Sequence, residues 1–393
     1  MYLSEYLPRL EQISVTVDVP PSTNAVRSLA LRDTRILLDT AIKNTSENTP
    51  NPDACTTSAA AGTAGTPRTP GGTDAHAWAS TTHHEIHLPL QETAKLAGAK
   101  ITKLACRDDV VALTLSLNAP KVKAEPSPFT ALPNTNGVWS VEDLLKKTPR
   151  DTRDVSQFQF TCAACGAVIV DSKSFKFVDM PSEYWHELMD FWHCHKPHED
   201  HHNIDINEKN YNGKLNPKPG YVHVGSSYIL LPSSTENCAR CGFHLGKIDG
   251  TALKINKWNL HLTYSGKTEK YPPYSYVYFA MLDRVNSSGV RKFTVKRRGS
   301  SSAYNVWVTS VGLDVSYADK TLAECLKLLY AVQSDSRDDD VLEVEAEVFD
   351  SLHSYFTENN ALLPKGHQKV ELMDGDLKRK YDVCYLAPQG NTL

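Results

Sequence analysis

Two short stretches decide how this chain folds: TCAACGAV at residues 161–168 and NCARCGFHLG at residues 237–246. Each contains a CxxC pair, so together they offer four thiolates, the number that a closed tetrahedral zinc site requires. In each stretch a glycine, Gly166 or Gly242, follows the second cysteine, where the chain of a zinc knuckle turns sharply and often needs a positive φ. The sequence therefore predicts one structural Zn²⁺ site, formed by Cys162, Cys165, Cys238 and Cys241.

The two CxxC pairs lie far apart along the chain. The 72 residues from Gly166 to Asn237 are many more than a compact zinc ribbon contains, so a shared ion would close a long loop and pin two distant strand ends together. Two other interpretations stay open: the pairs are reduced surface thiols, or one of them is a redox motif. Thioredoxin-like chemistry needs a βαβ context with the first cysteine at a helix N-terminus, whereas here a strand leads through a turn into another strand.

Between the pairs lies a second group of side chains of metal-binding type. It consists of His193, Cys194, His195, His198, His201 and His202. Imidazoles and a thiol at this density could hold a second metal or supply a replacement ligand to the first. A loop rich in His, Lys, Asp and Asn is also typical of a solvated segment, so the sequence leaves this second site open.

Composition limits the class of protein to which the chain belongs. Its 393 residues are enough for two or three domains with sizeable cores, and 40% hydrophobic and 22% charged residues are ordinary for a globular protein. The formal net charge of -4, from 42 basic and 46 acidic residues, argues against strong direct nucleic-acid binding. Apolar runs such as residues 228–231 are far shorter than the roughly 20 residues of a membrane span, so no membrane association is expected.

The first residues and the cysteines indicate in which cellular compartment the protein is expected. The opening sequence MYLSEYLPRLEQ lacks the basic segment and apolar core of a secretory signal. In a reducing compartment, the nine cysteines are not expected to form a disulfide framework. We therefore expect the protein in the nucleus and cytoplasm.

Hydrophobic patterning predicts a mainly β (α+β) fold with two sheet-rich lobes and a few helices, pinned by the four-cysteine zinc site. Alternation of apolar and polar side chains within residues 1–120 indicates an N-terminal β domain, a sandwich or barrel. It is interrupted at 41–83 by a Ser, Thr, Ala, Gly and Pro-rich insertion that we expect to be disordered. The proline-rich segment 119–137 is expected to be a linker, and 138–393 the zinc-containing domain.

Most of the second half also shows the pattern of strands. The expected strands are 158–160, 221–231, 252–264, 274–282, 291–298, 303–317, 368–374 and 381–388. Apolar residues at helical spacing predict four helices, at 141–147 with Ser140 as its cap, 183–192, 321–332 and 348–364.

Two cysteines outside the CxxC pairs are candidate nucleophiles. Cys384 lies in an expected strand a few residues after Lys378, Arg379 and Lys380, whose charges could favour a thiolate, and Cys194 follows an expected helix. The alternative for Cys384 is a small buried side chain in a strand. A reactive thiol needs exposure and a lowered pKa.

The order of these elements resembles one known family. Over about residues 158–386, the chain is similar to the HECT-like family that binds ubiquitin-conjugating enzymes. The similarity lies in the run CAACG, PSEYWHELMDFWHCH, GYVHVGSSYILLPSS, NCARCGFHLG, LKINKWNLHL and AECLKLLY. The most specific parts are the Trp-rich helix with the Cys194 and His195 that follow it, the turn at 225–227 and the CxxCGxxLG element at 238–246.

The resemblance implies partners and an activity. Members of the family are described as ubiquitin-protein ligases, which implies a ubiquitin-conjugating enzyme as partner and transfer of ubiquitin through a thioester. Fungal members are linked to pre-mRNA cleavage and polyadenylation, which implies the endonuclease subunit of that machinery as a second partner. The low-complexity insertion is compatible with a fungal source.

Three functions therefore stand as hypotheses. The first is a ubiquitin ligase in which Cys384 or Cys194 accepts ubiquitin. The second is a zinc-stabilised adaptor or assembly chaperone for the 3′-end-processing endonuclease, with no chemistry of its own. The third is a redox or metal-transfer protein that uses the CxxC pairs and the histidine cluster.

Overall fold

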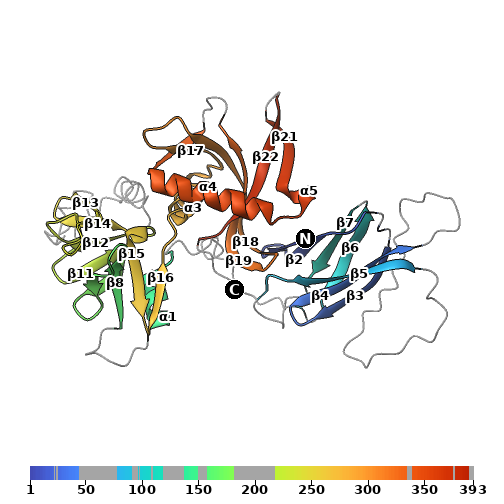
Figure 1. Cartoon of the computed structure of the whole chain (residues 1–393), viewed down its shortest axis with the longest axis horizontal. Helices are drawn as coiled ribbons and strands as arrows, with labels where there is room; N and C mark the ends of the chain where they lie inside the picture. Colours follow the sequence, from blue (N-terminus) through green and yellow to red (C-terminus); the bar gives the residue numbers. More distant parts are fainter. Residues whose placement is uncertain are drawn as a thin grey trace, which may run out of the picture. The chain divides into compact units, whose positions relative to one another are not determined.

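A computed structural model describes residues 1–21, 23, 25–43, 78–90, 96, 98–107, 109–117, 137–148, 157–180, 217–333, 339–374 and 377–388. The chain divides into two compact units, and each is described by itself. Unit 1 consists of Met1–Ala131, Ser302–Arg337 and Ser354–Leu393, and unit 2 of Leu132–Ser301 and Asp338–His353. Strands dominate both units, as the sequence predicts (Figure 1).

Unit 1 is built on a long antiparallel sheet in the order β21-β22-β19-β18-β1-β2-β7-β6. A second antiparallel sheet contains β3, β4 and β5 in that order. The strands are β1 Tyr2–Leu7, β2 Gln12–Asp18, β3 Ala25–Arg32, β4 Arg35–Lys43, β5 Trp78–His87, β6 Lys100–Arg107, β7 Val110–Ser116, β18 Ala303–Tyr317, β19 Lys320–Val332, β21 Lys369–Asp374 and β22 Leu377–Leu386. The short helix α5 spans Lys365–Gln368.

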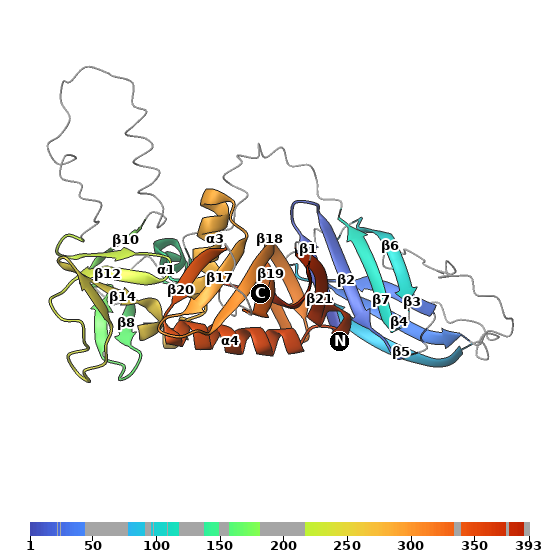
Figure 2. The same ribbon diagram turned by 90° about the horizontal axis from the view of Figure 1, so that it is seen from above.

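The N-terminal part of unit 1 is a β-sandwich. Apolar residues from β2 and β7, such as Ile13, Val15 and Leu113, pack with Ile36 and Ile86 of the second sheet in one buried cluster. Figure 2 shows the blue and cyan strands of the two sheets lying against each other. The period-two alternation therefore places the apolar side chains of both sheets in a shared core.

Unit 1 also contains the C-terminal strands, so the division between the two units differs from the boundary at 119–137 that the sequence suggests. The segments 302–337 and 354–393 group with residues 1–131, because β18 pairs with β1 in a register that joins Leu3 to Tyr317. A second buried cluster fills this part of the unit with Leu3, Tyr317, Leu329 and Tyr385 among its members. The expected domain 138–393 is thus divided between the two units.

Unit 2 contains two small sheets. One has the order β10-β11-β12-β14-β13 and the other β16-β15-β8-β9; only the β10–β11 pair in them is parallel. The unit also contains β17 and β20, which pair in parallel. The strands are β8 Phe158–Cys162, β9 Val168–Asp171, β10 Lys176–Asp179, β11 Tyr221–Val224, β12 Tyr228–Pro232, β13 Gly246–Asp249, β14 Ala252–Asn256, β15 Leu260–Tyr264, β16 Lys267–Lys270, β17 Lys292–Arg297 and β20 Asp340–Val344. The helical elements are α1 Val141–Lys147, η4 Lys257–Asn259, α3 Ser275–Ser288 and α4 Ala346–Ala361, whose first half belongs to this unit.

Aromatic side chains form part of the core of unit 2. Trp139 is fully buried, and its ring lies 5.5 Å from that of Phe160 and 5.6 Å from that of Tyr271. Phe158 extends the group to Phe177, at 4.9 Å between ring centroids. Such tilted and edge-on contacts hold α1 and the adjacent chain against β8 and β10.

Two segments have the opposite secondary structure to the one predicted. Of residues 274–282, expected as a strand, Tyr274 caps α3 and the rest lie in it; the helix follows Pro272 and Pro273 and is capped at its C-terminus by Gly289 with φ 71°. Residues 321–332, expected as a helix, form the central strand β19 between β18 and β22. These two expectations were wrong; the helix at 141–147 with its Ser140 cap and the helix beginning near 348 are confirmed.

Some expectations concern residues outside the described ranges. These are residues 44–77, most of the expected linker 119–137 and the expected helix 183–192. Residues 41–43 and 78–83, which the sequence assigns to the insertion, form the ends of β4 and β5. Among the described residues, we find no helix with the length and apolarity needed to cross a membrane.

Candidate metal centre

The first CxxC pair forms a tight turn at the end of β8. The backbone N–H of Cys162 donates to Ala167 O, and that of Gly166 donates back to Cys162 O, both at 2.8 Å. Gly166 has φ 70°, a left-handed conformation that glycine adopts without strain. The turn therefore aims the sulfurs of Cys162 and Cys165 toward one side.

The second CxxC pair repeats this turn. The backbone N–H of Cys238 donates to Phe243 O, and that of Gly242 donates to Cys238 O, again both at 2.8 Å. Gly242 has φ 74°. Two sequence-remote segments with the same spacing thus form the same local structure, as expected for a pair of zinc knuckles.

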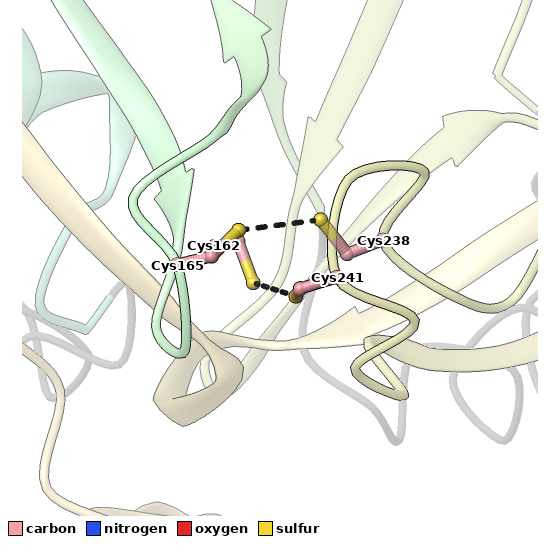
Figure 3. Close-up of side chains that lie close together, drawn as sticks. All are labelled: Cys162, Cys165, Cys238 and Cys241. Atoms are coloured by element: carbon pink, nitrogen blue, oxygen red, sulfur yellow. Dashed lines mark hydrogen bonds between the residues drawn. The ribbon is translucent and has the colours of Figure 1, made fainter.

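The two turns bring the four sulfurs together (Figure 3). The Sγ atoms of Cys162 and Cys241 lie 3.8 Å apart, those of Cys165 and Cys238 lie 3.7 Å apart, and all four are within 4.8 Å of one another. A tetrahedron with Zn–S bonds of about 2.3 Å has sulfur–sulfur edges of about 3.8 Å. The separations are far longer than a disulfide bond of about 2.0 Å. The donor set therefore fits a tetrahedral metal ion.

The pKa values of Cys238 and Cys241 are shifted in opposite directions. Backbone N–H groups of Cys241 and Arg240 lower the pKa of Cys238 to about 7 against the effect of burial. The backbone N–H of Phe243 lowers the pKa of Cys241, but the neighbouring sulfur of Cys165, burial and the sulfurs of Cys238 and Cys162 raise it to about 12. Four thiolates at this separation repel one another, and a divalent cation removes that repulsion.

Asn259 ties the two knuckles to each other. Its backbone carbonyl accepts a hydrogen bond from Ala163 N at 3.0 Å, inside the first knuckle. Its side-chain Nδ2 donates to Leu245 O at 2.9 Å, just after the second knuckle. The next residue, Leu260, pairs with Cys162 in the β15–β8 register. This buried asparagine therefore fixes the approach of the two CxxC turns.

Lys257 anchors the chain two residues before Asn259. Its side chain is fully buried, and Nζ donates to Val138 O at 2.5 Å and to Ser226 O at 3.0 Å. Burial lowers its pKa to about 7, although the nearby carboxylates of Asp179 and Asp143 oppose this change. No sequence signal singles out Lys257 and Asn259, because both lie inside the stretch 252–264 that the sequence predicts as one strand, whereas the structure interrupts it with η4.

The structure places the candidate nucleophile Cys384 in the core of unit 1. The side chain is fully buried in β22, opposite Leu328 of β19. Burial raises the pKa of the thiol far above its usual range, despite the nearby charge of Lys320. These properties favour the alternative of a small buried side chain in a strand. Cys194 and the cluster from His193 to His202 lie outside the described residues.

The centre has the chemistry of a structural site. Four cysteines provide all the ligands of a tetrahedral ion and leave no position for water or substrate. The described residues contain no other group of three or more His, Cys, Asp or Glu side chains placed to share a metal. The geometry thus supports a role in holding unit 2 together.

Comparisons with known proteins give the family. A protein of Saccharomyces cerevisiae named uncharacterized protein YJR141W is 29% identical over 278 residues, which cover 65% of this chain and 75% of the yeast protein. No solved structure matches the chain. The family described as HECT-like ubiquitin-conjugating enzyme (E2)-binding matches residues 5–374, which include nearly all of both units. The chain therefore belongs to the HECT-like E2-binding family.

Proposed function

We propose that this protein is a zinc-stabilised factor that binds a ubiquitin-conjugating enzyme. The observation that carries the proposal is family membership over residues 5–374, because the family is described by its binding of such enzymes. The four-cysteine centre supports a structural zinc ion in unit 2. A metal in this position would hold the two knuckles together and stabilise the strands that lead into them.

The burial of Cys384 favours an adaptor over a ligase. A cysteine that accepts ubiquitin must reach the thioester of the conjugating enzyme as a thiolate. Cys384 is enclosed in a sheet, and its pKa is raised. The ligase form of the proposal therefore rests on Cys194, and the adaptor form needs no nucleophile.

The adaptor form of the proposal includes a client. We propose the endonuclease subunit of pre-mRNA 3′-end cleavage and polyadenylation, on the basis of the family resemblance given above, and a location in the nucleus and cytoplasm. The net charge of -4 supports recognition of a protein in preference to direct RNA binding.

A thioester assay separates the two forms. A conjugating enzyme charged with ubiquitin is mixed with the wild type, with Cys194→Ala and with Cys384→Ala, and the products are resolved without reductant. A reductant-sensitive ubiquitin adduct that is lost in one variant establishes a ligase and identifies its cysteine. Complex formation without an adduct establishes the adaptor, and absence of any complex with a panel of conjugating enzymes contradicts the proposal.

A further inference from the structure

A groove of about 640 Å³ lies within unit 2, next to the second zinc knuckle. Its lining includes Phe243 and His244, which directly follow Gly242 of the knuckle. The remaining lining comes from the residue before β12, from β13 and β14, η4, the start of α3, the residue after β17, the end of β20 with the residue that follows it, and the start of α4. Segments from across the unit therefore meet at this groove.

Three aromatic side chains line the groove. Phe243, Trp258 and Tyr276 are each half-buried, so part of each ring faces solvent. The rings of Trp258 and Tyr276 lie edge to face with centroids 6.1 Å apart. Partly exposed aromatic residues in a concave site, tryptophan above all, are typical anchors of protein interfaces.

Charged side chains flank these aromatics in two groups. Lys247 and Lys254 project from β13 and β14 and are exposed. Glu343, Glu345 and Glu347 come from β20, the residue after it and α4, and are exposed as well; Glu345 is paired with Arg298. The groove therefore offers an apolar base with acidic and basic margins, a combination that selects a protein surface of complementary charge.

Trp258 is held between two fixed neighbours. Lys257 is anchored by two backbone carbonyls on one side, and Asn259 is bonded to both knuckles on the other. The backbone on both sides of the tryptophan is thus immobilised by buried hydrogen bonds. An anchor that is positioned before binding loses little entropy in the complex.

We propose that this groove is the docking surface for the ubiquitin-conjugating enzyme, with Trp258 as its central anchor. The inference rests on the proposed function and adds the site and its chemistry. In this arrangement an apolar side chain of the conjugating enzyme packs against Trp258 and Tyr276, and a neighbouring basic residue pairs with the acidic margin. Glu347 is a suitable probe of that margin because it is exposed at the start of α4.

The experiment is a titration of the full chain with a panel of purified yeast ubiquitin-conjugating enzymes. The variants are Trp258→Ala for the anchor and Glu347→Lys for the acidic margin. Lys267→Glu on β16, also exposed and in the same unit, is the matched control for a change of charge outside the groove. Zinc content and thermal melting are recorded for each variant, so that a loss of folding is recognised.

The expected result is a dissociation constant raised at least about tenfold by Trp258→Ala, as at an interface hot spot. Glu347→Lys also weakens binding, more at low salt than at high salt, and Lys267→Glu has no effect. If the wild type binds a conjugating enzyme and both groove variants bind equally well, the groove is the wrong surface and the proposed function stands. If the wild type binds none of the panel, both proposals fail. A concentration-dependent dimer that Trp258→Ala disrupts, with binding unchanged, would instead identify a second copy as the occupant.

Discussion

Each of the two knuckle turns holds two of the four cysteine sulfurs, so the loss of one sulfur leaves three, too few to complete a tetrahedral site. We expect Cys238→Ser to release zinc and lower the free energy of unfolding by several kcal/mol, since metal binding and folding are coupled. Elemental analysis and urea denaturation measure both effects. Cys106→Ser in β6 of unit 1 is the matched control and should retain zinc. If metal-free wild-type protein melts at the same temperature as untreated protein, the zinc assignment is wrong.

Lys257 should give the protein a specific dependence of stability on pH. The pKa of its buried amine is about 7 in the folded protein and that of an ordinary lysine in the unfolded chain. Between these values the unfolded state binds more protons, so stability rises as the pH increases; below about pH 7 both states are protonated and the effect ends. The neutral amine still has two N–H groups for the carbonyls of Val138 and Ser226.

The measurement is the difference in unfolding free energy between wild type and Lys257→Met as a function of pH. We expect the advantage of the wild type to grow by about 2 kcal/mol from pH 7 to pH 9. Lys254→Met, an exposed neighbour, should follow the wild type. A pH-independent difference for Lys257→Met would show that the amine remains charged in the folded protein.

The sequence predicts the cysteines of the centre but not the residues that support it. Spacing and the following glycines identify a knuckle because the turn itself demands them. Asn259 and Lys257 act through carbonyls of Leu245, Val138 and Ser226, which are remote in the chain. Such hydrogen bonds depend on how strands pack, and no local pattern records them.

At the scale of elements, the two wrong predictions have identifiable causes. In β19, Leu322, Leu326 and Leu329 fall at helical spacing because the β18–β19 register is irregular and Glu324 has φ 55°, which shifts the alternation. Leu328, Leu329 and Tyr330 of β19 are also buried in succession, so this part of the strand does not alternate with a period of two. In α3, the buried residues Val277 and Met281 do lie four apart, but the alternating, aromatic-rich pattern of residues 274–282 is also typical of a strand.

Helix α1 offers a test of a correctly predicted element. Ser140 Oγ accepts a hydrogen bond from Asp143 N at 3.2 Å, and the Asp143 carboxylate accepts one from Trp139 N at 2.9 Å. Ser140→Ala removes the first of these bonds and should lower stability by about 1 kcal/mol in urea denaturation. Ser140→Thr retains a hydroxyl and should cost less. Equal losses for the two substitutions would mean that the cap contributes nothing.

At the scale of the whole molecule, the four-cysteine centre belongs to one unit. All four cysteines lie in unit 2, whereas unit 1 has its own buried clusters. Removal of zinc with an added chelator should therefore increase amide hydrogen exchange in β8, β14 and β15, while the strands of the N-terminal sandwich stay protected. Mass spectrometry of peptides from both units measures this. Equal deprotection of both units would show that they unfold as one cooperative body.

The pairing of β1 with β18 has a consequence for synthesis on the ribosome. Tyr2–Leu7 is synthesised about 300 residues before its partner strand, Ala303–Tyr317. At ordinary translation rates of roughly 5 to 20 residues per second, one edge of β1 stays without this partner for about 15 to 60 s. An open strand edge is a template for pairing with other chains. The nascent protein therefore has a defined interval in which a chaperone would protect it, and a premature stop before Ala303 would make that exposure permanent.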